Sequence, residues 1–203
     1  MASKTSALLC SVLILSLTPV LRTPHLPRTL RACNVFAGWD NEASAAARKF
    51  IIACVLATDM DVHASLQEEL IRRKRREPAP PFDLSTEADR TFLAKCVLHS
   101  ADISNPTRPF KVCAHISMLA IQEFQQQAAE EKALGLPYSE SMLAADHASK
   151  CKGELGFTRF LAKPWFTAML DCFPDASRQA LDTIQANEAQ WELQAKLPSL
   201  TLV

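Results

Sequence analysis

The sequence is poor in the residues that make turns and strands. Of its 203 residues only 4 are glycine and 1 is tyrosine, and no stretch alternates polar and apolar residues for long enough to indicate a strand. Net charge is also missing, because 22 Lys and Arg balance 22 Asp and Glu. A neutral chain has no global attraction for nucleic acid or an anionic membrane. We therefore expect neither a β-rich fold nor a nucleic-acid partner.

The 7 cysteines lack the spacing of a metal or redox motif, since no CxxC pair occurs. Several of them fall inside apolar helical patterns, as buried reduced thiols do. We expect the folded part to belong to a reducing compartment, the cytoplasm first. The cysteines are Cys10, Cys33, Cys54, Cys96, Cys113, Cys151 and Cys172.

Residues 1–45 are expected to be a leader or linker. An apolar run, Ala7–Leu17, is followed by three prolines between positions 19 and 27, and no acidic residue precedes Asp40. The run has the apolar core of a secretory signal without a clear cleavage site, and the basic, acid-free composition loosely fits a transit peptide. It is too short for a membrane span. Targeting to a membrane or organelle and a disordered or non-native leader all stay open here.

From Ala46 onward the apolar residues recur at helical spacing. We predict an all-α fold, a compact multi-helix bundle over residues 46–197, with a short tail at 198–203. The length suits one sizeable core. The predicted helices cover about 46–59, 62–76, from the Ser85-Thr86 cap to the Asn105-Pro106 break, 109–132, 141–152, 156–172 and 175–196.

Two helix ends carry local signals. The basic run Arg72–Arg76 ends one predicted helix and is interpreted as a solvated terminus that suits the helix dipole, rather than as a lipid or nucleic-acid patch. Asp175, after Pro174, is expected to cap the last helix.

The most informative segment is His99–Pro106, where Asp102 and Asn105 stand in a polar break after an apolar helical run. An isolated aspartate at a helix end would be explained as a capping or turn residue. This block and its surroundings, however, closely resemble the class I cyclic nucleotide phosphodiesterases. The resemblance covers residues 47–195 and corresponds to the C-terminal half of that family's catalytic domain. Further matching blocks are Leu56–Met60 with His63, Glu123-Phe124, Ala148-Ser149, Gly156-Phe157, Pro164-Trp165, Asp175-Ala176, Leu181–Thr183 and Trp191.

The resemblance implies hydrolysis of a 3′,5′-cyclic nucleotide to the 5′-monophosphate. In the family a hydroxide shared by two divalent metals attacks phosphorus, with zinc in the tight site and magnesium or manganese in the looser one. By this resemblance Asp102 is a metal ligand, and Thr58 and Asp59 order metal-bound waters. His99 has the family's place before Asp102 and lies either near the metal ligands or as a packed core imidazole. No residue of this chain is assigned as catalytic.

The resemblance also implies three substrate-binding residues. Phe157 has the position of a phenylalanine that stacks on the purine, and Asn105 that of an asparagine at the base edge. Glu154 stands where the family has a glutamine, whose amide both donates and accepts. An ionised carboxylate only accepts and would repel the keto oxygen of guanine. We therefore expect cyclic AMP to be preferred over cyclic GMP, or Glu154 to be held protonated.

The family's paired-histidine blocks, HNxxH and HD, are missing from this sequence, although it has 5 histidines. In the family these blocks supply most ligands of the tight site and the general acid. One carboxylate without such partners is not expected to hold zinc tightly.

Three hypotheses follow. The chain is part of a phosphodiesterase catalytic domain whose activity needs the missing blocks. Alternatively, it is a catalytically silent helical protein that binds nucleotide weakly or pairs with itself or a full-length relative through an exposed apolar face. The third hypothesis is a membrane-anchored helix bundle built on Ala7–Leu17.

Overall fold

The computed structural model describes residues 36, 38–75, 80–143, 145–170 and 172–199. The sequence-based predictions for Ala7–Leu17, Cys10 and Cys33, and for most of the tail, lie outside these residues. Within the described part, helices and their connections are the only elements, so the all-α prediction is confirmed. The chain divides into two units, Met1–Asp102 and Ile103–Val203, and each is described by itself.

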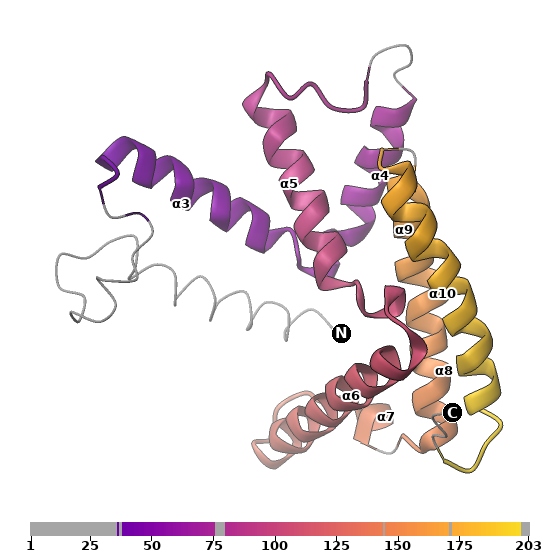
Figure 1. Ribbon diagram of the computed structural model, residues 1–203. Helices are drawn as coiled ribbons and strands as arrows, with labels where there is room; N and C mark the ends of the chain where they lie inside the picture. The colour runs from indigo at the N-terminus through magenta and orange to yellow at the C-terminus, as the bar shows by residue number, and fades with distance from the viewer. Residues whose placement is uncertain (1–35, 37, 76–79, 144, 171, 200–203) are drawn as a thin grey trace. The chain divides into compact units, whose positions relative to one another are not determined.

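The described residues of the first unit form three α-helices and a 3₁₀ turn (Figure 1). The first helix begins at Asn41 rather than at the predicted Ala46, because the Asp40 carboxylate accepts the Ala43 N–H at 2.7 Å and caps it. Asp40 was not recognised as a cap in the sequence. The elements are α3 (Asn41–Leu56), η1 (Met60–Val62), α4 (His63–Lys74) and α5 (Glu87–Asp102).

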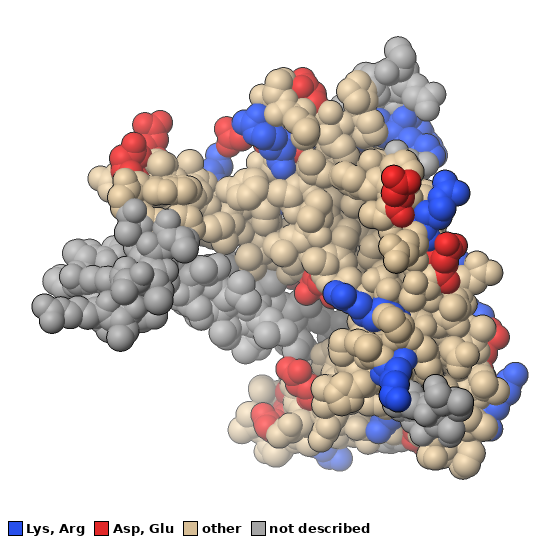
Figure 2. Space-filling view, in the orientation of Figure 1, with Lys and Arg blue, Asp and Glu red and all other residues tan. Residues whose placement is uncertain are grey.

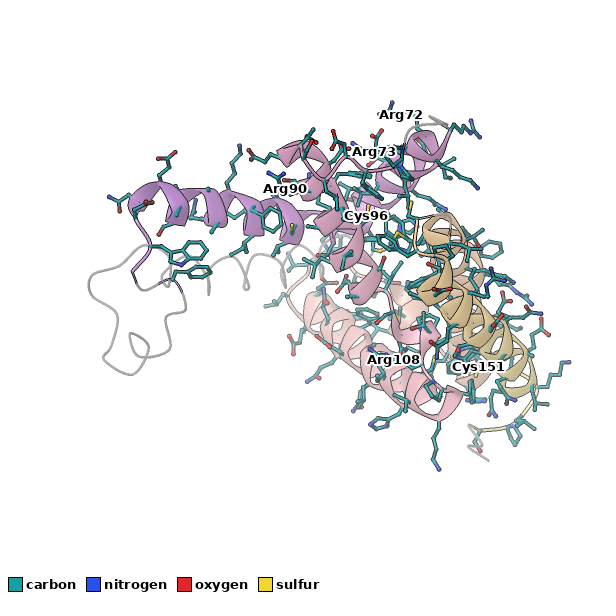
Figure 3. The ribbon with its side chains drawn as sticks, turned by 45° about the horizontal axis from the view of Figure 1, so that its top comes forward. Arg72, Arg73, Arg90, Cys96, Arg108 and Cys151 are labelled. Atoms are coloured by element: carbon teal, nitrogen blue, oxygen red, sulfur yellow. The ribbon has the colours of Figure 1, made fainter. Side chains whose placement is uncertain are left out.

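The basic end of α4 is only partly solvated, which corrects the interpretation of the basic run. The Arg73 side chain (labelled in Figure 3) is 11% exposed. It donates to Glu69 one turn earlier and to Asp89 on α5, both at 2.7 Å, and its guanidinium carbon lies 4.4 Å from the centre of the Phe92 ring. Arg72, by contrast, is 58% exposed and pairs with Glu69 alone among the described residues. Within the basic run, Arg73 therefore joins α4 to α5, an arrangement called the Arg73 clamp below, whereas Arg72 lies on a solvated face.

The second unit is built around its last helix. α10 (Pro174–Gln194) packs along α8 (His147–Phe157) and α9 (Lys163–Leu170) (Figure 1). Side chains of α6 (Phe110–Ala133), α8 and α10 meet in one buried cluster. That cluster comprises Cys113, Ala114, Cys151 and Trp191, with Phe110, Met118, Leu155 and Ala195 packed against it. Its described residues also form short elements, among them η2 (Asn105–Thr107) and α7 (Glu140–Leu143).

Three sequence-based predictions for this unit are wrong. The predicted helix at 141–152 is two helices, α7 and α8, and α8 begins at His147 because the Asp146 carboxylate accepts the Ser149 N–H. No helix begins at Gly156; α8 runs past it into a π-helical turn, η3 (Thr158–Ala162), and on into α9. In this turn the Lys163 N–H donates to the Thr158 carbonyl, directly before Pro164, whose missing N–H would interrupt a regular α-helix. Asp175 does not cap α10 either, because the helix already begins at Pro174 and leaves Asp175 in its first turn.

The cysteines of the described residues are all free thiols, and four of these five are buried, as the sequence predicts. Acidic and basic side chains are interspersed on the face shown in Figure 2. In the part of the chain that the structure covers, no single helix has the length and apolar character needed to cross a bilayer. Only α3 together with Met60–Lys74, bent by 80°, meets that criterion as a pair.

Candidate functional site

Asp102 is the last residue of α5 and is exposed. Protein atoms around its carboxyl group still exclude enough solvent to raise its pKa. Among the described residues it has no cationic partner that would lower this pKa. The carboxylate is therefore accessible to an added cation.

Thr58 and Asp59 lie in the turn between α3 and η1. The Thr58 hydroxyl donates to the Val55 carbonyl at 2.8 Å, and the Asp59 carboxylate accepts the Asp61 N–H at 3.0 Å. Both side chains thus stabilise local backbone. Their role in ordering metal-bound water stays a prediction from the resemblance.

His99 is completely buried in the first unit and is held through both ring nitrogens. Its Nδ1 lies 2.9 Å from the Ala57 carbonyl, which can only accept, so Nδ1 carries the proton. Its Nε2 then accepts from the Nδ1–H of His63 at 2.8 Å. Burial lowers the pKa of both imidazoles. This pair fastens the turn that carries Thr58 to the helix that carries Asp102.

The described residues do not fit a two-metal centre. They contain no group of three or more His, Cys, Asp and Glu side chains placed to hold a metal ion. Asp102 is one potential ligand, whereas a tight zinc site needs three or four. The ligand set implied by the resemblance is therefore not assembled within these residues.

A chain of polar contacts joins three segments of the second unit. The Asn105 amide nitrogen, from η2, donates to the Ser117 hydroxyl on α6 at 3.0 Å and to the Cys113 carbonyl at 3.1 Å. The Ser117 hydroxyl donates to Glu154 on α8 at 2.5 Å. The structure thereby brings together two of the three residues that the resemblance assigns to the purine, Asn105 and Glu154.

Ser117 was not identified as a site residue from the sequence. It stands on the apolar face of α6 and is 2% exposed. The available signal was a single hydroxyl on an otherwise apolar face of the helix. A buried hydroxyl needs a hydrogen-bond partner, so its position indicated a buried polar contact. Its partner, however, comes from another helix.

The surroundings of Glu154 favour its neutral form. Burial raises the pKa of this carboxyl group, although the Ser117 hydrogen bond partly opposes the rise. Burial and the Glu154 charge together raise the pKa of Cys113 to about 11, and they also raise that of Cys151 on α8 (labelled in Figure 3). Phe157, half-buried, lies one turn after Glu154 and ends α8.

Known proteins of one family resemble this chain. Residues 20–184 match the family model of the 3′,5′-cyclic nucleotide phosphodiesterases. The mouse high affinity cGMP-specific 3′,5′-cyclic phosphodiesterase 9A is 31% identical over 180 residues, which are 83% of this chain and 33% of that protein. The mouse 3′,5′-cyclic-AMP phosphodiesterase 4C is 29% identical over 169 residues, 82% of this chain and 24% of that protein.

A solved structure agrees with this result. The phosphodiesterase domain of the Salpingoeca rosetta rhodopsin phosphodiesterase superposes with a TM-score of 0.74 at 33% identity, covering 81% of this chain and 49% of that domain. The chain thus spans about a third or less of the two mouse relatives and about half of the solved domain. Together with the all-α fold, these matches show that the chain belongs to the 3′,5′-cyclic nucleotide phosphodiesterase family.

Proposed function

We propose that this chain binds the purine of a 3′,5′-cyclic nucleotide through its second unit. The observation that carries the proposal is the hydrogen-bonded chain from Asn105 through Ser117 to Glu154. It gathers polar groups from η2, α6 and α8, one turn before Phe157. Paired polar groups beside an aromatic ring can bind a base edge and a base face.

We further propose that Asp102 is one ligand of a divalent-metal centre of the family type, with zinc and magnesium or manganese. When bound, such metals supply a hydroxide nucleophile and stabilise charge on the phosphate. The described residues of this chain do not complete that centre. We therefore expect this chain to bind nucleotide without hydrolysing it unless the HNxxH and HD residues of the family are supplied.

The preferred nucleotide under this proposal is cyclic AMP. The names of the two mouse relatives point in opposite directions, one to cyclic GMP and one to cyclic AMP. Glu154 supports the second, because an ionised carboxylate repels a keto oxygen and accepts from an amino group.

Calorimetric titration of the purified 203-residue chain with cyclic AMP and cyclic GMP tests the binding. We expect saturable binding of cyclic AMP, weaker binding of cyclic GMP, and loss of both in Phe157→Ala. The control is Phe160→Ala, since this nearby phenylalanine is 77% exposed. Absence of binding to the wild-type chain, or equal losses in both variants, would refute the proposal.

Turnover is tested separately, by chromatography of the products after incubation with zinc and magnesium or manganese. We expect no 5′-monophosphate above the rate of the buffer, together with less than one bound zinc per chain. Stoichiometric zinc and steady hydrolysis would show that the chain completes its own metal centre.

A second candidate function is association with the rest of a phosphodiesterase domain. An apolar groove of about 500 Å³ lies between α3 and α5 in the first unit, lined by Phe50, Cys54, Arg90, Leu93, Ala94, Val97, Leu98 and Ala101. Phe50 and Val97 are 42% and 52% exposed there. The solved domain is about twice as long as its matched part, so helices of a family relative are the occupant we propose.

This association is tested by sedimentation of the chain mixed with the unmatched half of a related phosphodiesterase domain. Val97→Lys should abolish the complex, whereas Leu134→Lys, an exposed leucine of the other unit, should not. Complex formation unaffected by Val97→Lys would exclude this groove as the interface. If the chain instead associates with itself, the sample that contains this chain alone will sediment as an oligomer.

A further inference from the structure

We propose that the apolar run Ala7–Leu17 of this chain occupies the apolar groove between α3 and α5, and that helices of a family relative must displace it before they bind there. The first half of this proposal concerns the isolated chain. The second half rests on the second candidate function, association through this groove, and makes the run a regulator of that site.

The groove offers its occupant an almost entirely apolar surface. Seven of its eight lining residues are apolar or cysteine, and the eighth is Arg90 (labelled in Figure 3). The Arg90 guanidinium already donates to the carbonyls of Leu84 and Ser85, both at 2.8 Å. A segment that fills this groove should therefore be apolar and needs no acidic residue.

The run Ala7–Leu17 lies outside the described residues, so its match to the groove is one of composition and length. It has no charged residue, and nine of its eleven residues are hydrophobic. Along α5 the groove extends from Arg90 to Ala101, which is about 16 Å at a helical rise of about 1.5 Å per residue. A helical segment of eleven residues has that same length.

The segment that follows the run is less suited to the groove. Residues 18–40 contain three arginines and three prolines. Burial of an arginine without a partner is unfavourable, and proline lacks the N–H that a helix needs. The same residues serve as a tether, because the run precedes them and α3 follows them.

The tether is long enough for the run to reach the groove. Its 23 residues span at most about 80 Å. Phe50 and Cys54, which line the groove, lie about 14 and 20 Å along α3 from its first residue, Asn41. Tethering gives a segment an effective concentration on the order of millimolar at a site within its reach. The run therefore competes with any separate partner that is present at a lower concentration.

Alkylation of a reporter thiol tests whether the groove is covered. Val97→Cys places a thiol in the groove wall, where Val97 is 52% exposed, and Val112→Cys places one on α6, where Val112 is 46% exposed. In the full 203-residue chain, adding Leu13→Lys should accelerate alkylation by iodoacetamide about 10-fold at the first thiol and leave the second unchanged. Leu26→Lys, outside the run, should change neither rate. Peptide mass spectrometry measures each rate, and a rate at the first thiol that ignores Leu13→Lys would overturn the proposal.

Crosslinking identifies the occupant, because Cys10 lies within the run. Dibromobimane joins two thiols that lie close together, with loss of one bromide to each. We expect it to join Cys10 to the thiol of Val97→Cys within one chain, and Cys10→Ser should remove this link. A link formed only between two chains would assign the groove to a second copy, and absence of any link would leave the run elsewhere. Either result would overturn the proposal.

The regulatory half is tested by sedimentation with the unmatched half of a related phosphodiesterase domain. Leu13→Lys should tighten this complex about 10-fold, and Leu26→Lys should not change it. Equal affinity of the wild-type chain and Leu13→Lys would show that the run does not regulate the groove. Absence of any complex would overturn the association and its regulation together. The alkylation and crosslinking results would still decide by themselves whether the run occupies the groove.

Discussion

The two units each contain a buried polar network, and the networks differ in the ionisable groups that they hold. In the first unit His99 is satisfied through both nitrogens, by the Ala57 carbonyl and by His63. In the second unit the polar contacts through Ser117 join Asn105 to Glu154. The first network is called the closed network below, because its central ring, His99, uses both nitrogens within the fold.

The networks also differ in their response to protons. Burial lowers the pKa of the two histidines and raises that of Glu154, so it favours the neutral form in each case. A lower pH therefore destabilises the folded first network, whose histidines must stay neutral, and stabilises the folded second network, whose carboxyl group becomes neutral.

Removal of the centre of the closed network should have the largest effect. His99→Leu leaves His63 and the Ala57 carbonyl without a buried partner, and we expect a loss of about 3 kcal/mol in the free energy of unfolding, measured by urea denaturation. His115→Leu, at an exposed position on α6, is the control. Equal losses in the two variants would mean that the histidine pair is not a stabilising network.

The Arg73 clamp is a second closed network in the first unit. Arg73→Met should cost about 2 kcal/mol, because it leaves Glu69 and Asp89 without their shared partner near the Phe92 ring. Arg72→Met should cost less than about 0.5 kcal/mol, since the Arg72 side chain is mostly exposed. The same urea experiment distinguishes them, and comparable losses would contradict the clamp.

Glu154→Gln should stabilise the second unit at neutral pH, by about 1 kcal/mol. A carboxyl group whose pKa is raised on folding destabilises the folded state once the pH exceeds that folded value, and the cost disappears below its unfolded value, near pH 4. The gain in melting temperature over wild type should therefore be largest at pH 8 and shrink toward pH 4. Exposed Glu130→Gln is the control. A gain that does not depend on pH would refute the explanation by burial.

The smallest effect is expected from mild acidification of the wild-type chain. Because the folded pKa of His63 and His99 is lowered, the folded state binds fewer protons than the unfolded one. The stability they contribute is fully present above the unfolded pKa of about 6.5 and is lost as the pH falls from there through the lowered folded pKa. Amide hydrogen exchange, corrected for intrinsic rates, should show α5 losing more protection than α6 between pH 7.5 and 5.5. The opposite order would contradict the closed-network interpretation.

The helical fold was predictable because apolar spacing and caps are local signals. Thr86 is an example, since its hydroxyl accepts the Asp89 N–H at 3.2 Å at the predicted start of α5. Gly156 was misleading because an isolated glycine is tolerated inside a helix and does not by itself begin or end one. The π-helical turn after it has no local sequence signature beyond Pro164.

The candidate site was predictable only in part. The resemblance placed Asn105 and Glu154 near the base, but their connection through Ser117 spans 12 residues on one side and 37 on the other. Periodicity carries no information at such separations. The Arg73 clamp was missed for the same reason, because its partner Asp89 belongs to another helix.

The turn η3 has a consequence for the core of the second unit. A π-helical turn holds one residue more than an α-helical turn, so it shifts the azimuth of everything downstream by about 100°. Trp165 and Phe166 follow it directly and are buried, at 0% and 8% exposed. Deleting a single residue from Thr158–Ala162 would remove this shift and turn both rings away from the interior. The burial of the Trp165 and Phe166 rings therefore depends on the one extra residue in the π-helical turn that precedes them.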